Sequence, residues 1–235
     1  MKTFAITARL AAVTALTMGA ATAANAQLTI PFGWTESNSV QTFPADNLAA
    51  FDLVKLTVSA KGNAYVAKAG TPGETNGTVT PVAFGFPVTK IVVGSKLNIA
   101  SGTASGSALY FERFNDDTGG IVGFTLANFT INYDTKQVLA DVTPKGGVVA
   151  LQQPIYNFNV ATPLALKFKL PLTVTGYEVL DKLALTPQAK AVFTNVLELP
   201  EFALFALDFD YGTLIQDIST KIRKKSVSSA AYVAK

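Results

Sequence analysis

The sequence predicts a mainly β protein, an antiparallel β-sandwich with one or two short helices near the C-terminus. Apolar and polar residues alternate over most of the chain, as they do in strands with one buried face. Clusters of Gly, Pro, Asn and Thr separate the alternating segments, and these residue types break strands because of their backbone dihedrals. Hydrophobic residues make up 49% of the chain and charged residues 15%, so a sizeable core is expected.

The strongest strand signal lies in the segment SALYFERFNDDTGGIVGFTLANFTINYDTKQVLADVT, residues 107–143. Turn formers at 115–120 and a second reversal at 134–136 divide it, which predicts a meander of three or four antiparallel strands. Strand alternation also predicts strands over 51–60, with a change of phase, and over 202–211.

One helix stands out in LTPQAKAVFTNVLELP. Thr186 is a suitable N-cap, Pro187 fits the first helical position, and Pro200 ends the segment. The apolar positions between them follow the spacing of one helix face. The segment TLIQDISTKIRKK, residues 213–225, is predicted to form a final short helix.

The first 26 residues have the pattern of a secretory signal peptide. Lys2 and Arg9 form a short basic region, an Ala-rich apolar run follows, and small residues precede a cleavage site after Ala26. A membrane anchor is the alternative, but it requires about 20 consecutive strongly apolar residues and this run is shorter.

The rest of the chain is expected to hold one domain and a tail. Residues 27–222 form the β-sandwich domain, and the segment near 101–106 is either a joint between two parts or a loop. Residues 223–235 form a basic, flexible tail. Residues 27–220 hold 12 basic and 16 acidic side chains, so nucleic-acid binding by the body is not expected.

The chain contains no His and no Cys. This composition excludes Ser–His–Asp and Cys–His nucleophile systems, His-based zinc sites, thiolate metal sites and disulfides. The segment GSKLNIASG lacks the Lys-Ser/Thr pair of a phosphate-binding loop. No later segment is apolar for long enough to predict a membrane-spanning helix, so an integral membrane protein is not expected.

Two groups of carboxylates are candidate sites. Asn115, Asp116 and Asp117 offer the hard oxygen donors that calcium prefers, although a solvated hairpin turn uses the same residue types and the loop alone supplies too few ligands. Asp208 and Asp210 are two residues apart, which in a strand places both on one face. Such a pair suits acid/base hydrolysis, and the alternative is the solvated face of the strand.

Tyrosines are the remaining candidate ligands. A Tyr phenolate can coordinate haem iron, and Tyr110, Tyr133 and Tyr156 are the candidates for that role. The structural alternative is that these rings form core or cross-strand pairs.

The order of strands and turns in SALYFERF, GGIVGFTLANFTINYDTKQVLADVT, LALTPQAKAVFTNVLEL and ALDFDYGTL resembles secreted bacterial β-proteins distantly related to the HtaA-like domain family of haem-uptake proteins. The resemblance covers about residues 95–214. It implies a β-sandwich at the cell surface or in the periplasm and a function in ligand capture. It does not assign the haem-binding tyrosine to one position of this chain.

The leading hypothesis from the sequence is an exported, non-enzymatic β-protein with a structural or assembly role at the cell surface or in the extracellular matrix. Controlled pairing of strand edges between copies builds layers or fibres, so the expected partners are other copies or a surface polysaccharide. This hypothesis requires no cofactor; calcium and haem belong to the alternatives. The main alternative is a secreted or periplasmic binding module for haem or a glycan, and a carboxylate-based hydrolase is the third hypothesis.

Overall fold

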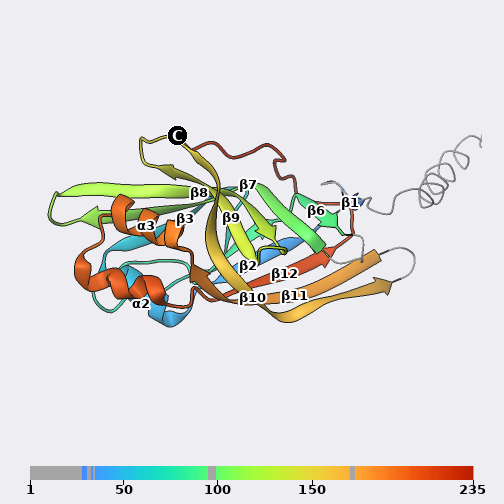
Figure 1. Cartoon of the computed structure of the whole chain (residues 1–235), viewed down its shortest axis with the longest axis horizontal. Helices are drawn as coiled ribbons and strands as arrows, with labels where there is room; N and C mark the ends of the chain where they lie inside the picture. The colour runs from blue at the N-terminus through green and yellow to red at the C-terminus, as the bar shows by residue number, and fades with distance from the viewer. Residues whose placement is uncertain (1–27, 31–32, 34, 95–98, 170–172, 235) are drawn as a thin grey trace, which may run out of the picture.

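The computed structural model describes residues 28–30, 33, 35–94, 99–169 and 173–234, so the predicted signal peptide lies outside the described residues. The chain is mainly β, and its described strands and helices follow one another as in Figure 1. They are β1 (Leu28–Ile30), β2 (Asn38–Thr42), α2 (Ala45–Leu53), β3 (Leu56–Gly62), β4 (Tyr65–Lys68), β5 (Ala83–Pro87), β6 (Lys90–Val93), β7 (Ile99–Asn115), β8 (Gly120–Asn132), β9 (Gln137–Pro144), β10 (Ala150–Lys169), β11 (Thr173–Leu185), α3 (Pro187–Val196), the 3₁₀ helix η2 (Glu201–Asp208) and β12 (Thr213–Ser219).

The described strands form one antiparallel sheet of 12 strands. The strand order is β1-β6-β7-β8-β9-β10-β11-β12-β2-β5-β4, and β3 pairs with the second half of β7. The sheet curls until distant strands face each other: the rings of Phe86 on β5 and Phe129 on β8 lie 4.9 Å apart. We call the face turned toward the core the inner face and the opposite one the outer face. The expected antiparallel β fold is thus present, whereas a sandwich of two sheets is not confirmed.

The predicted meander is confirmed as β7, β8 and β9. Residues 115–120 make the first turn, and β8 and β9 pair from Phe124–Pro144 to Asn132–Gln137 with a register shift between Ala127 and Thr130. Phe111 and Phe124 are fully buried partners on β7 and β8 with stacked rings 5.0 Å apart. The segment near 101–106, considered above as a joint or a loop, is part of β7 and is paired with β6 and β8.

The helices gather at one end of the curled sheet (Figure 1). The predicted helix is confirmed as α3, and the Thr186 side chain accepts a hydrogen bond from the Ala189 amide. Phe193 of α3 packs edge-on against Phe111 and Phe124 at 5.3 and 5.0 Å. Edge-on aromatic contacts of this kind stabilise a core beyond the area that they bury.

A buried cation joins two helix ends to the sheet. Arg113 of β7 is 5% exposed, and its guanidinium donates to the backbone carbonyls of Val54, Leu197 and Glu198. These carbonyls end α2 and α3, where the helix dipole and the unpaired carbonyls favour a positive charge.

Three predicted elements are wrong. Residues 51–53 belong to α2, and β3 begins only after Lys55, which has a positive φ of 56°. Residues 201–208 form η2 because Pro200 and Glu201 start a helical turn where strand alternation was expected. The predicted C-terminal helix is instead the strand β12, whose alternate side chains enter the core.

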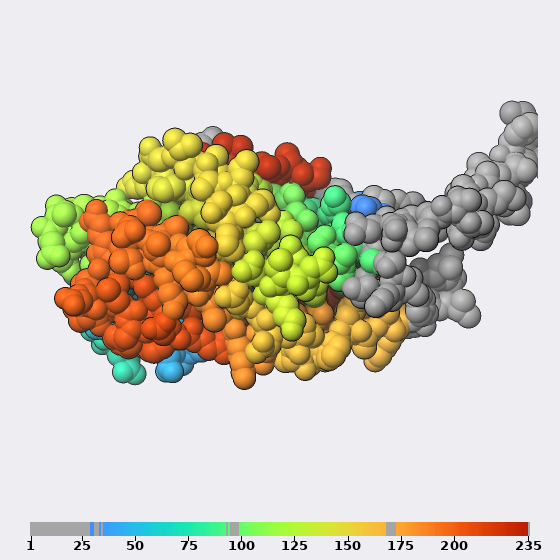
Figure 2. Space-filling view, in the orientation of Figure 1, coloured from blue at the N-terminus to red at the C-terminus, as the bar shows by residue number. Residues whose placement is uncertain are grey.

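Residues 220–234 follow β12 without regular secondary structure. They run over the outer face, and Figure 2 shows them in dark red on the surface beside the β9–β10 hairpin. The segment expected as a free tail therefore contacts the sheet through the hydrogen bonds described below. Within the described residues, no helix is long and apolar enough to cross a membrane.

Candidate functional site

A cavity of ≈ 40 Å³ lies on the inner face between opposite walls of the curled sheet. This volume holds about three water molecules. Its walls are mainly apolar and come from strands that are far apart in the sheet order. They include Phe86, Val88, Phe129, Ile131, Leu183 and Leu214.

Polar side chains enter this apolar cavity from β2 and β12. In the sequence NSVQT of β2, Ser39 and Gln41 are buried, while Val40 between them is only half-buried. The antiparallel register places Ser39 beside Gln216 and Gln41 beside Leu214. The usual pattern of strand burial is therefore inverted here, with amide and hydroxyl groups at the core positions.

The hydrogen bonds of these side chains leave one donor free. Ser39 Oγ donates to Gln216 Oε1, and Gln41 Nε2 donates to the Tyr156 hydroxyl at 3.3 Å. Gln216 Nε2 is buried at the cavity wall and has no hydrogen-bond partner among the described residues. A buried donor without a partner costs free energy, so its presence requires an explanation.

A buried acid and a partly buried phenol lie beside this group. The β11–β12 register places Glu178 next to Gln216, and Glu178 accepts a hydrogen bond of 2.5 Å from the Tyr133 hydroxyl. Glu178 is 4% exposed, and burial raises the pKa of its carboxyl above 4.5, although the bond from Tyr133 opposes the shift. Burial, and then the Glu178 charge, raise the pKa of Tyr133 well above 10. Ser39, Gln216 and Glu178 lie side by side across β2, β12 and β11. We call these three residues the polar row.

The structure separates the three tyrosines proposed for haem. Tyr156 and Tyr133 are on the inner face, whereas Tyr110 is on the outer face near Lys61, whose ammonium lies 5.9 Å from the ring centroid. Burial raises the pKa of Tyr156 to about 12, and a bond from Gln41 opposes the shift only in part. A haem ligand must be a phenolate, and a macrocycle is far larger than ≈ 40 Å³. The inner-face tyrosines therefore do not fit a haem group in this arrangement.

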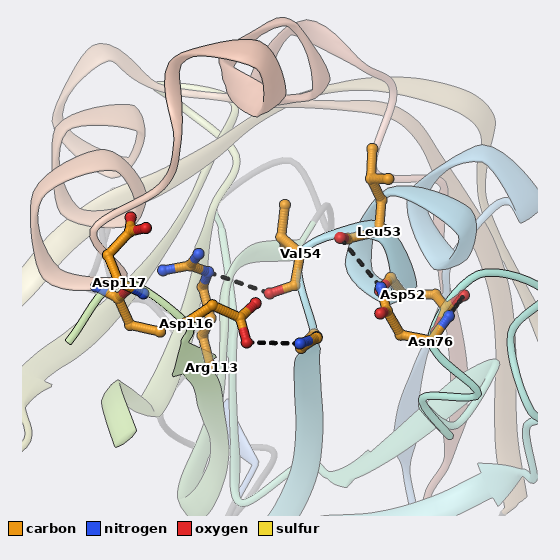
Figure 3. A network of polar contacts seen from close by, with 9 residues as sticks. Asp52, Leu53, Val54, Asn76, Arg113, Asp116 and Asp117 are labelled. Carbon is orange, nitrogen blue, oxygen red and sulfur yellow. Dashed lines mark hydrogen bonds and ion pairs between the residues drawn. The ribbon is translucent and has the colours of Figure 1, made fainter. Parts of the chain in front are cut away.

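The calcium candidates occupy the β7–β8 turn. Asp116 pairs with Lys55 at 2.6 Å, and the Asn115 side chain accepts from the Asp117 amide and donates to Glu198. Figure 3 shows the carboxylates of Asp116 and Asp117 pointing in different directions. The three residues thus make the contacts of a hairpin turn and do not converge on one point.

Asp52 of α2, labelled in the same view, binds the loop that precedes β5. Asp52 accepts hydrogen bonds from the amides of Thr75, Asn76 and Thr78 at 2.7–3.0 Å. Burial alone would raise the pKa of this carboxyl, but the hydrogen bonds from the backbone amides outweigh burial. The pKa of Asp52 is therefore below 3.8. Asp52 therefore holds a loop in place and is not directed at a ligand.

Asp208 and Asp210 do not share a strand face. Asp208 ends η2 and pairs with Lys190 of α3, while Asp210 accepts a hydrogen bond from the Gly212 amide at 2.8 Å. Among the residues that the structure describes, no group of three or more His, Cys, Asp or Glu side chains is arranged to hold a metal ion.

The polar row was missed by sequence reasoning. Its signal was present in β2, where Ser39 and Gln41 are alternate residues, and in β12, where Gln216 lies in the same alternate set as Leu214 and Ile218. Either set of alternate residues in NSVQT can face inward, and only the pairing with β12 decides which does.

No protein-family model matches the chain, and no curated protein matches its sequence. Among solved structures, the chain is similar to the C-terminal domain of HtaA from Corynebacterium glutamicum, with 13% sequence identity and a TM-score of 0.46. The match covers 79% of this chain and 97% of that domain. The predicted resemblance is thus confirmed as a distant structural resemblance to the HtaA C-terminal domain, and no ligand is assigned from it.

Proposed function

We propose that this chain is a non-enzymatic binding protein that holds a small, mainly apolar molecule in the inner-face cavity. The observation that carries the proposal is the buried Gln216 Nε2 donor, which lacks a partner at the wall of an otherwise apolar cavity. Ligand sites combine apolar walls with a few placed polar groups in this way. The absence of His and Cys from the sequence also favours binding over catalysis.

The cavity chemistry defines the ligand class. Phe86, Phe129 and Ile131 offer apolar contact, and the Gln216 amide offers one hydrogen bond to an acceptor. The volume of ≈ 40 Å³ admits a group of a few non-hydrogen atoms, such as a short ketone or the end of a longer molecule. An exported protein, secreted or held in the periplasm or at the cell surface, would meet such molecules outside the cytoplasm.

Titration with butan-2-one, followed by nuclear magnetic resonance of the Gln216 side-chain amide, tests the proposal. We expect saturable shifts of this amide and of the Leu183 and Leu214 methyl signals in the wild-type chain, and loss of the saturable methyl shifts in Gln216→Met, since both leucines line the cavity. Asp217→Asn is the matched control, because Asp217 is the next residue of β12 and is exposed. The absence of a saturable shift with butan-2-one, phenol or butyrate would contradict the proposal and would leave the cavity to ordered water. Haem titration with visible absorbance is run in parallel, and retention on a polysaccharide column tests a glycan ligand.

A structural or assembly role at the cell surface is the second candidate function. It is favoured by β4, which ends the strand order and whose Tyr65 and Val66 are 42% and 48% exposed. Exposed apolar edge strands are templates for pairing between chains. Light scattering at increasing protein concentration tests this role, and a strictly monomeric chain at high concentration would contradict it.

A further inference from the structure

The C-terminal segment is held on the outer face by two asparagines that bind its backbone. Asn63 Nδ2 donates to the Ser228 carbonyl at 2.7 Å, and Asn63 Oδ1 accepts from the Ser228 amide at 3.0 Å. Asn128 makes the same pair of bonds with Tyr232, at 3.0 Å to its carbonyl and 2.7 Å from its amide. Each asparagine side chain therefore binds both the backbone N–H and the backbone C=O of one residue in the segment, as a neighbouring strand would.

Two glycines keep the path of the segment open. Gly62 and Gly106 have positive φ values of 61° and 76°. A Cβ atom at Gly106 would lie 2.9 Å from the Ala230 carbonyl oxygen, and one at Gly62 would lie 2.8 Å from the Tyr232 ring. Such contacts are too close for a side chain, so both positions need glycine for the close approach as well as for the backbone conformation.

The body of the protein holds both asparagines independently of the segment, since Asn63 Nδ2 also donates to the Ser105 carbonyl at 3.0 Å and Asn128 is fixed more firmly. Asn128 is 7% exposed and has a positive φ of 55°, which is uncommon for a residue other than glycine. Its side chain also accepts from the Gly106 amide at 3.0 Å and donates to Asp141 at 2.8 Å. These bonds orient the Asn128 amide before any peptide arrives, as preorganised binding sites do. We call the surface formed by Gly62, Asn63, Gly106 and Asn128 the asparagine groove.

The C-terminal segment makes few apolar contacts with the rest of its own chain. Its residues 228–231 and Val233 are exposed, so little apolar area is buried when the segment docks. Residues 220–225, which connect it to β12, have no regular secondary structure. A terminal segment with these properties can leave its groove without unfolding the sheet, and exchange of an identical element between copies is a low-cost route to assembly.

We propose that the asparagine groove is a peptide-binding site read through the backbone, and that the C-terminal segment of a second copy enters it in place of the chain's own segment. This partner fits because the groove already binds the same sequence within one chain. When each copy places its C-terminal segment in the groove of the next copy, the copies are linked head to tail. Such an assembly is an open chain, unless the rotation between successive copies closes it into a ring. The inference does not depend on a ligand in the cavity, which lies on the other face of the sheet.

Engineered disulfides test the exchange, because the chain contains no cysteine. Lys61 and Val233 line the same hollow beside the groove and are both exposed. One full-length copy carries Lys61→Cys, a second with a different tag carries Val233→Cys, and the two are mixed before mild oxidation. We expect a disulfide-linked dimer that contains both tags. A single chain with both substitutions gives the intrachain bond and shows that the geometry permits the link.

Matched variants separate exchange from chance collision. Asn63→Ala in the Lys61→Cys copy should lower the yield of the mixed dimer several-fold, and a synthetic peptide of residues 226–235 should compete for the groove. Asn195→Ala, an exposed asparagine on α3, is the control and should leave the yield unchanged. Failure of the mixed dimer to form while the intrachain bond forms would overturn the exchange. A mixed dimer that is insensitive both to Asn63→Ala and to the peptide would overturn the groove as its site.

Discussion

Replacing the Ser39–Gln216 pair by apolar residues should stabilise the protein. In Ser39→Ala/Gln216→Met, the unpartnered Gln216 Nε2 donor is removed, and so is the bond from Ser39 to Gln216 Oε1. Loss of that hydrogen bond costs about 0.5–1.5 kcal/mol, whereas a buried donor without a partner costs about 1–3 kcal/mol. The double variant also adds apolar surface to an apolar wall. We therefore expect a net increase of about 1–2 kcal/mol in the free energy of unfolding.

Urea denaturation and calorimetry measure this change. For a chain of this size, each kcal/mol moves Tm by about 2–4 °C. Gln216→Met alone should gain less, because it leaves the Ser39 hydroxyl without its acceptor. A double variant less stable than the wild type by more than about 1 kcal/mol would refute the reasoning, since the amide would then be serving the fold. A gain in stability together with loss of butan-2-one binding is the expected signature of a group kept for function.

Three other substitutions, and Phe205→Ala as a control, test the electrostatics and the core. Burial raises the Glu178 pKa, so the native state keeps the proton of this carboxyl to higher pH than the unfolded chain does. The free energy of unfolding should therefore fall as the pH rises above 4.5. In Glu178→Gln, urea denaturation should no longer show this fall. The Asp52 pKa is lowered, so this carboxylate stabilises the fold above pH 3.8, and the stabilisation is lost as the pH falls further. Asp52→Asn should lower the free energy of unfolding by about 1.5–3 kcal/mol. It should also speed hydrogen exchange of the amides of residues 75–78. Phe193→Ala should cost about 3–5 kcal/mol in calorimetry, while Phe205→Ala, 57% exposed, should cost about 0.5 kcal/mol or less.

Strand alternation predicted the meander well because large apolar side chains recur at alternate positions of β7, β8 and β9 and face the core. Phe111, Phe124 and Leu126 occupy inner positions, and their spacing can be read from the sequence alone. The same signal failed at residues 51–53, which are the last turn of α2, and at residues 201–208, which form η2 after Pro200. A short apolar run fits a strand or a buried helical turn equally well, and tertiary packing decides between them.

The functional features depended on contacts that local sequence cannot specify. The polar row is assembled from three strands whose order in the sheet differs from their order in the chain. The docking of residues 226–234 depends on Asn63 and Asn128, which lie far away in sequence and whose role requires positive φ values nearby. Composition indicated a frayed basic tail because small and charged residues bury little area. Four hydrogen bonds between asparagine side chains and the backbone of the segment hold it despite that.

The cavity and the asparagine groove use the same distortion of the sheet from opposite sides. The pairing of β7 with β8 shifts register between Ala104 and Ala108, and the pairing of β8 with β9 shifts between Ala127 and Thr130. Bulges of this kind redirect side chains to the other face of a sheet. Ala104 and Phe129 consequently line the cavity, while Asn128 binds the backbone of the C-terminal segment and Gly106 lies close beneath it. Because a bulge moves both neighbours together, a substitution that flattens it must alter the inner and the outer site at once.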